Sequence, residues 1–206
     1  MRLRERFVAL GTIALLCGCA GGSVRTSYYT LSPEPGPAAG AAASGAGTRA
    51  VGVAVWQVAI PEIADRRQLV VRTSPNRVEI SEAHQWAEPL RLGIARALAA
   101  DLAARLGAGY AVVAGQPLGA RPDVRVFLDV QTFEATAGGS VAVEVLWSVR
   151  PSRGEAREGR SAASEPAPAD HAGIAAAYSR ALARVARDIA AAVAASRESR
   201  GPAGPA

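Results

Sequence analysis

Short hydrophobic runs along the chain predict a β-sheet. An almost wholly apolar run covers residues 51–60 and ends at a proline. Two further runs, 68–73 and 77–80, flank turn-forming residues, so we expect them to pair as a hairpin. A shorter stretch, 28–31, is rich in aromatic and β-branched side chains, which suit a pleated and half-buried surface. These four segments are expected strands.

The second half of the chain continues this pattern with clearer alternation. In residues 123–130 the valines and a leucine alternate with charged side chains and one phenylalanine. Residues 141–149 repeat the pattern after a Gly-Gly turn, so the two segments should pair as a hairpin. One apolar and one charged face are typical of a sheet that is covered on one side. We also expect a strand at 110–113 and a polar edge strand at 153–164.

Two segments have the apolar spacing of an amphipathic helix. The first opens at Trp86-Ala87-Glu88-Pro89-Leu90 and stops at Gly107, and the second follows Asp170, a reasonable N-cap. The expected buried stripes are Leu90, Ile94, Ala97, Leu98, Leu102 and Leu106 in the first helix and Ile174, Tyr178, Leu182, Val185, Ile189 and Val193 in the second.

The order of these elements predicts an α+β fold. We expect a two-layer sandwich, in which two long helices cover one face of a mostly antiparallel sheet. Its other face is left for solvent or a partner. The domain should span residues 49–197, with a short strand and a flexible Ala/Gly/Pro-rich loop inside 19–48 and a disordered tail at 198–206. Trp56 and Trp147 lie inside predicted strands and are expected packing residues.

The N-terminus has the pattern of a bacterial lipoprotein signal peptide, residues 1–18. Basic residues precede an apolar run of about ten residues, which is too short for a bilayer span of roughly 20. Cys19 then follows a small residue and is the expected lipidation site. Cys17 is the alternative, but Leu16 before it is not small. A plain signal peptide or an uncleaved anchor helix would not need the cysteine at position 19.

Lipidation at Cys19 would make this residue the start of the mature chain and its membrane anchor. Two or three acyl chains, at about 0.8 kcal/mol per buried methylene, hold a protein on a membrane effectively permanently. Ala20 follows the cysteine where an aspartate would favour inner-membrane retention. We therefore expect an outer-membrane lipoprotein whose domain faces the periplasm. No cysteine thiol would then remain for disulfides, catalysis or metal binding.

Charge and composition argue against nucleic acid as a partner. The net charge is +5, and all 23 basic residues are arginines. They are scattered along the chain, without the basic stripe and interleaved aromatic platform of a nucleic-acid-binding surface. We therefore expect no nucleic-acid function.

The sequence contains no recognisable catalytic or metal-binding constellation. His84 and His171, the two histidines, have no partner at metal-ligand spacing, so we interpret both as surface histidines. Residues 138–142 begin like a nucleophile elbow but lack its closing glycine. Asp123 and Asp129 are interpreted as part of a solvated strand face. We expect a non-enzymatic protein without cofactor or metal.

Two short segments carry a resemblance to a known family. One is Pro61-Glu62-Ile63-Ala64-Asp65-Arg66, a Pro-x-x-x-Asp-Arg pattern, and the other is Trp86-Ala87-Glu88-Pro89-Leu90 before a long helix. With the Tyr-rich strand after the lipidation signal, they resemble the ABC-type transport auxiliary lipoproteins, the paraquat-inducible protein C-like family. The resemblance covers about residues 27–195. The chain departs from it at 33–48 and at the polar stretch 151–169.

The resemblance implies a non-enzymatic outer-membrane component of a lipid-transport system. Its partners would be an ABC transporter and a periplasmic MCE-domain protein that moves lipid between two membranes, and a ring or another homo-oligomer is compatible with this role. The expected docking residues are Asp65, Arg66, Arg67 and Trp86. As alternatives, the three charged residues form a turn that fixes the hairpin, and Trp86 is a plug under the first helix.

Two other functions stay open at this point. The first is a lipid- or small-ligand-binding lipoprotein, which should have an apolar concave surface and copurify with lipid. The second is an outer-membrane assembly factor, which should be recovered together with barrel-assembly components.

Overall fold

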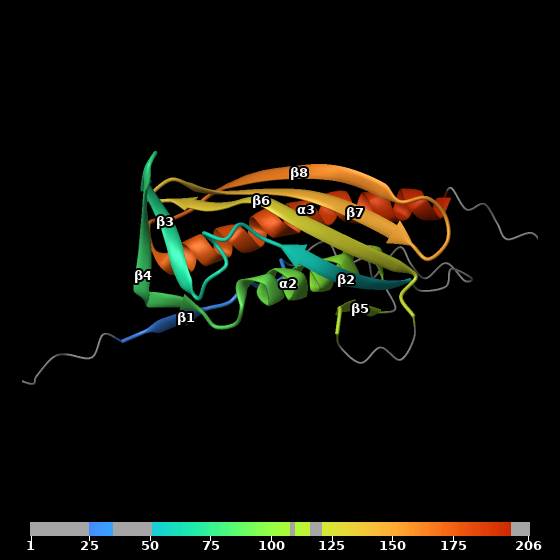
Figure 1. Ribbon diagram of the computed structural model, residues 1–206, viewed down its shortest axis with the longest axis horizontal. Helices are drawn as coiled ribbons and strands as arrows, with labels where there is room; N and C mark the ends of the chain where they lie inside the picture. The colour runs from blue at the N-terminus through green and yellow to red at the C-terminus, as the bar shows by residue number, and fades with distance from the viewer. Residues whose placement is uncertain (1–24, 35–50, 108–109, 116–120, 199–206) are drawn as a thin grey trace, which may run out of the picture.

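The described part of the chain forms one eight-stranded sheet with two helices on one of its faces (Figure 1). The computed structural model describes residues 25–34, 51–107, 110–115 and 121–198. This architecture confirms the predicted α+β class. The elements are β1 (Ser27–Tyr29), β2 (Gly52–Ala59), β3 (Gln68–Ser74), β4 (Arg77–Trp86), α2 (Leu90–Leu106), β5 (Tyr110–Val113), β6 (Val124–Thr136), β7 (Ser140–Pro151), β8 (Arg157–Pro166) and α3 (His171–Glu198).

Several predicted features lie outside the described residues. These are the signal peptide, Cys19, the loop at residues 35–48 and the tail after residue 198. They stay predictions from the sequence.

The sheet is mixed, which the sequence did not predict. The β3–β4 hairpin and the β6–β7–β8 meander are antiparallel, and the meander contains the longest pairings. β1 pairs with β4, β5 with β2, and both β2 and β3 with β6, in parallel. Parallel pairs join segments that are distant along the chain, so no turn sequence between the strands predicts them.

β6 is a central strand of the sheet and is paired along both edges. β7 pairs with one edge along nearly its whole length. The other edge is shared by two strands placed end to end. β2 covers the first half, up to the pair Ala59–Asp129, and β3 covers the last residues, at Val71–Ala135 and Arg72–Thr136. The residues between β2 and β3 therefore form a corner beside the middle of β6.

β6 and β7 are longer than their alternation predicted. The expected strands ended at Val130 and began at Val141, whereas the hairpin extends to Thr136 and starts at Ser140. A bulge between Val130 and Thr132 shifts the register of β6, so the simple alternation breaks although pairing continues. Gly138 forms the turn with a φ of 62°, a conformation that glycine adopts without strain.

The two helices bury the stripes that the sequence predicted, except that Leu106 is half-buried. α2 packs against β2 and β5, α3 packs against β7 and β8, and the helices contact each other. Figure 1 shows both on the same side of the sheet. α2 ends at Gly107 in the left-handed conformation, as expected. At the start of α3, Asp170 Oδ1 accepts the N–H of Gly173 at 2.8 Å, which confirms the predicted N-cap.

The two strand tryptophans differ in their surroundings. Trp147 is half-buried, donates from Nε1 to Ser161 Oγ at 3.0 Å and lies over Gly159 of β8, so its packing role is confirmed. Trp56 is 43% exposed, so its prediction as a packing residue was wrong. A register shift of β2 between Val55 and Gln57 breaks the alternation there, and Trp56 lies outside the core.

Candidate docking site

The predicted docking residues lie in the corner at residues 61–67, which connects β2 to β3. Its backbone folds into a tight turn, in which the N–H groups of Ala64 and Asp65 donate to the carbonyl of Pro61 at 2.9 and 3.1 Å. Pro61 has no N–H to donate to a neighbouring strand, which agrees with the end of β2 at Ala59. The local sequence therefore explains the shape of the corner.

Asp65 and Arg66 fix this corner. The carboxylate of Asp65 forms an ion pair with Arg91 in the first turns of α2. Nε of Arg66 donates to the carbonyl of Ile63 at 3.0 Å. Both side chains thus make the contacts expected of a charged turn, while the Asp65–Arg91 pair stays on the surface and can meet a partner.

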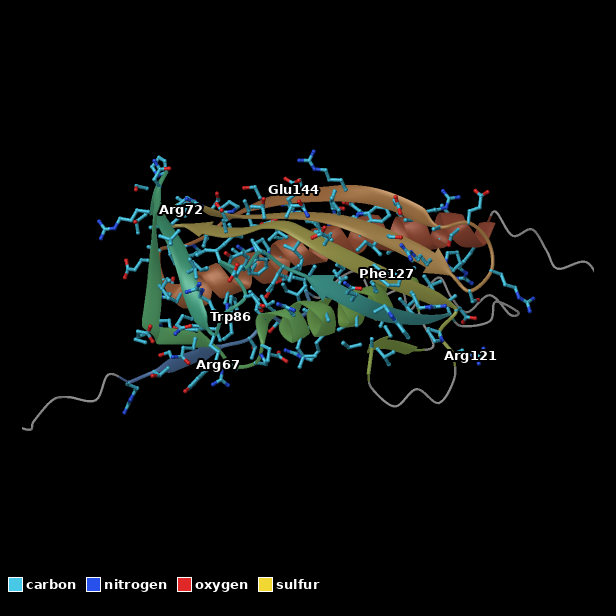
Figure 2. All side chains as sticks on the ribbon, viewed as in Figure 1. Arg67, Arg72, Trp86, Arg121, Phe127 and Glu144 are labelled. Carbon is cyan, nitrogen blue, oxygen red and sulfur yellow. The ribbon has the colours of Figure 1, made fainter. Side chains whose placement is uncertain are left out.

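Arg67 is the member of the predicted set whose side chain is most open to a partner. Its backbone carbonyl accepts the N–H of Trp86 at 2.6 Å, which ties the corner to the end of β4. Its side chain is exposed and forms no hydrogen bond or ion pair within the described part of the chain. Figure 2 shows Arg67 at the end of the domain that carries β1.

Trp86 is a core residue, 4% exposed. Its ring meets those of Phe133 and Tyr178 edge to face, with centroids 6.5 and 6.1 Å apart, and the last two rings stack on each other at 3.9 Å. Burial raises the pKa of the Tyr178 hydroxyl above its ordinary value. This environment favours the alternative interpretation of Trp86 as a plug. Trp86 packs in the core next to the corner and offers almost no surface to a partner.

A charged contact joins β3 to the far end of β6 beside the corner. The guanidinium of Arg72 binds both carboxylate oxygens of Glu134, at 2.9 and 2.7 Å. The pKa of Glu134 is lowered because Arg72 donates to its carboxylate. Planar two-point contacts of this kind fix orientation as well as distance. The pair holds β3 in register against β6.

The N-terminal segment, residues 25–34, is held tightly against the same end of the domain. β1 pairs with the last residues of β4, with Tyr29 opposite Trp86. Leu31 is 2% exposed and forms part of the core. The N–H groups of Ser32 and Glu34 donate to Ser179 Oγ and Asp101 Oδ1, both at 3.1 Å. We call residues 27–34 the N-terminal strap.

The two histidines meet at this strap, which corrects their interpretation as separate surface residues. His84 of β4 and His171 at the start of α3 stack with ring centroids 3.7 Å apart. The hydroxyl of Tyr29 lies 2.8 Å from Nδ1 of His84. The pKa of His171 is lowered, first by burial and then by His84. Sequence reasoning missed the pair because the two residues come from elements that only tertiary packing brings together.

Searches for metal-binding and membrane-spanning features give two findings. The described residues contain no group of three or more His, Cys, Asp or Glu side chains placed to hold a metal ion. Over the same ranges, no helix is both long and apolar enough to cross a membrane.

Comparisons with known proteins define the family. The model of the family described as "ABC-type transport auxiliary lipoprotein component" matches residues 29–190. The chain belongs to this family. It is 32% identical over 140 residues to the intermembrane transport lipoprotein PqiC of Escherichia coli K12, covering 67% of this chain and 71% of that protein. The PqiC protein of Shigella flexneri matches with the same values.

Solved structures share the fold of this family member. One, described as an uncharacterized protein, has a TM-score of 0.64 at 21% identity and covers 82% of this chain and 99% of its own. A protein from Xanthomonas campestris has a TM-score of 0.56 at 19% identity, covering 85% and 98%. At these identities the likeness concerns the fold alone.

Proposed function

We propose that this protein is a non-enzymatic, lipid-anchored subunit of an intermembrane transport system. Cys19 would attach it to the outer membrane, and its domain would face the periplasm. There it would hold a periplasmic MCE-domain assembly, served by an ABC transporter, at the membrane that gives or receives lipid. Membership of the auxiliary lipoprotein family and similarity to PqiC, an intermembrane transport lipoprotein, support this assignment.

One observation carries the docking proposal, namely that strap and corner flank the same stretch of β4. Tyr29 pairs with Trp86 on one side, and the carbonyl of Arg67 accepts from Trp86 on the other. Only five residues separate Cys19 from Arg25, the first described residue, so the tether reaches about 20 Å when extended. A partner that binds Asp65, Arg66 and Arg67 would therefore be held close to the lipid anchor.

The pockets between the packed elements give little support to the alternative function of a lipid carrier. Both helices pack directly onto the sheet, and the two pockets that border Phe133 measure about 30 and 10 Å³. An acyl chain needs a far larger cavity, since ligand pockets usually hold about 300–1,000 Å³. The described residues therefore favour docking over transport of a whole lipid inside the domain.

The docking proposal is tested by site-specific photo-crosslinking in membranes. A photoreactive residue replaces Arg67 in the corner or, as a control, Ala162, which is exposed on β8. We expect MCE-domain or ABC-transporter subunits to be crosslinked from position 67 and not from position 162. Recovery of barrel-assembly components alone would instead favour an assembly factor. Equal products from both positions would exclude the corner as the docking site.

The anchor is tested separately with Cys19→Ala. We expect the wild-type protein to sediment with outer membranes after a high-salt wash and the variant to be released. A variant that stays with the membrane under these conditions would exclude Cys19 as the anchor.

A further inference from the structure

The face of the sheet opposite the helices carries two arginines directly across from each other. Arg125 of β6 and Arg150 of β7 are cross-strand partners, and both are exposed. Like charges at opposed positions repel and destabilise a strand pair. Other arginines of the domain form ion pairs with carboxylates, but among the described residues neither of these two does so. The protein thus keeps a repulsive pair of cations on its surface.

Aromatic rings hold both guanidinium groups in place. Cζ of Arg125 lies 5.2 Å from the ring centroid of Trp56, and Cζ of Arg150 lies 4.6 Å from that of Phe127. Such contacts attract a cation to the ring face without neutralising its charge. Leu146, 41% exposed on β7, adds apolar surface nearby. We call Trp56, Arg125, Phe127, Leu146 and Arg150 the arginine–aromatic face.

Two surface hollows adjoin this face. The first, about 360 Å³, is lined by Trp56, Arg121, Pro122, Arg125 and Ser152, which include two arginines and no carboxylate.

The second hollow, about 420 Å³, is lined in part by Phe127 and Leu146, and Asp129 and Glu158 also border it. Both hollows have the size of small-ligand sites. The cationic part of the face is therefore separate from the part that is apolar and mildly acidic.

This combination indicates the chemistry of the occupant. Guanidinium groups bind phosphate through two parallel hydrogen bonds, and all cations of this chain are arginines. Tryptophan and arginine beside aliphatic surface are typical of residues that lie at the membrane–water interface. An acidic peptide would be repelled by Asp129 and Glu158 in the second hollow, whereas the uncharged glycerol and acyl atoms of a lipid would not.

We propose that the arginine–aromatic face binds the phosphate of an anionic bilayer phospholipid. Arg125 and Arg150 take the headgroup phosphate, and Phe127 and Leu146 meet the glycerol and first methylenes. The anion removes the repulsion between the two opposed arginines. Figure 2 shows Arg121 and Phe127 away from the end of the domain that carries Arg67 and Trp86, so this site is separate from the docking corner.

Tryptophan fluorescence of the full-length lipidated protein tests the site. The protein is placed in phosphatidylcholine vesicles, with or without about 30 mol % phosphatidylglycerol. Subtracting the spectrum of Trp56→Phe isolates Trp56, because Trp86 and Trp147 are present in both proteins. We expect phosphatidylglycerol to shift Trp56 emission to the blue and brominated phosphatidylglycerol to quench it.

Matched charge variants identify the residues responsible. The lipid-dependent change should be lost in Arg125→Glu/Arg150→Glu. It should persist in Arg77→Glu/Arg187→Glu, which alters net charge equally at two exposed positions on β4 and α3. Arg125→Gln/Arg150→Gln should also lose the response. It relieves the repulsion between the two arginines, so it serves as the second variant if the glutamate variant folds poorly by circular dichroism.

Three kinds of outcome of the fluorescence experiment would contradict the proposal. Equal Trp56 spectra in both vesicle types, or an unchanged response in the Arg125/Arg150 variants, would overturn it. Inorganic phosphate that reproduces the change in phosphatidylcholine vesicles would assign the face to free phosphate. Trp56 changes that follow protein concentration and not lipid would assign it to a second copy of the chain. Vesicle flotation is scored in parallel, because loss of flotation contradicts the anchor at Cys19 and not this site.

Discussion

At the scale of single residues, Asp101 shows how burial controls ionisation. Its side chain is 1% exposed; Oδ1 accepts the N–H of Glu34 at 3.1 Å, and Oδ2 has no hydrogen-bond partner among the described residues. Burial raises its pKa to about 6, although the Glu34 N–H and Arg105 act in the opposite direction. The folded protein therefore binds a proton at Asp101 between about pH 4 and 6, where the unfolded chain does not.

Asp101→Asn should make the domain less sensitive to pH. Stability of the wild type falls as pH rises from 3.8 toward about 6, because the folded state must then give up a proton from a buried site. We expect the variant to gain about 2 to 3 kcal/mol over wild type between pH 4 and pH 8. Urea unfolding at both pH values measures this difference, and a difference that does not change with pH would contradict the assignment.

Gly159 is a second residue with a defined steric role, because it lies under the ring of Trp147. A Cβ at this position would lie 2.3 Å from the indole ring, whereas one at Gly139 would meet neighbours at 3.6 Å. We expect Gly159→Ala to destabilise the domain by about 1 to 3 kcal/mol, with little effect of Gly139→Ala. Thermal unfolding of both variants checks this, and equal melting temperatures would show that Trp147 moves aside freely.

At the scale of elements, β1 is short, and its attachment depends on side chains. It pairs with β4 over three residues only. The additional hold comes from Tyr29 on the His84–His171 stack, from buried Leu31 and from the hydrogen bonds of Ser32 and Glu34. Pairing over three residues alone would give the strand only marginal stability. The strap is therefore an element that tertiary contacts create.

Acidification should loosen the strap through His171. Its lowered pKa means that the unfolded chain binds a proton first as pH falls below about 6.5, so stability is lost as pH decreases through this window. His84, Tyr29, Glu79 and Asp170 surround the group, and both carboxylates oppose the shift. We expect His171→Gln to reduce the loss of stability between about pH 7 and pH 5.

Hydrogen exchange of the β1 and β4 amides at these two pH values is the measurement. Wild-type exchange should accelerate at the lower pH, after correction for intrinsic rates, more than exchange in the variant. Matching behaviour of the two proteins would show that the histidine stack does not hold the strap.

At the scale of the whole molecule, the two sheet faces and the two ends have different tasks. One face is covered by α2 and α3, and the other carries the arginine–aromatic face. The strap and the corner share one end of the domain, so the proposed docking residues lie beside the segment that leads to the proposed anchor. Under the two proposals, the docking corner and the arginine–aromatic face are separate contact surfaces of one domain.

Leu31→Ala should weaken the link between anchor and domain. The side chain is 2% exposed, so its truncation leaves a cavity in the core and should cost about 2 to 5 kcal/mol. Leu92→Ala, at a 43% exposed position on α2, is the matched control and should change stability little. Chemical unfolding of both variants gives the comparison. A small effect of Leu31→Ala would show that the strap is not part of the cooperative core.

Much of the architecture could be predicted because it depends on local periodicity. The stripe from Ile174 to Val193, the alternation in β6 and β7 and the stop at Gly107 all follow from spacings of two or 3.6 residues or from one backbone conformation. The start of the first helix was placed too early, because Trp86 is the last residue of β4 and α2 begins at Leu90.

Only the tertiary structure decided which strands pair and which distant side chains are in contact. The parallel pairing of β1 with β4, the stack of His84 on His171 and the alignment of Arg125 with Arg150 join residues far apart in sequence. The exposure of Trp56 depended on a register shift that breaks alternation. The sequence by itself therefore determined the order and type of the elements, the buried stripes of the helices and the family. Strand partners and the surfaces they create required the fold, because long-range contacts leave no periodic trace along the chain.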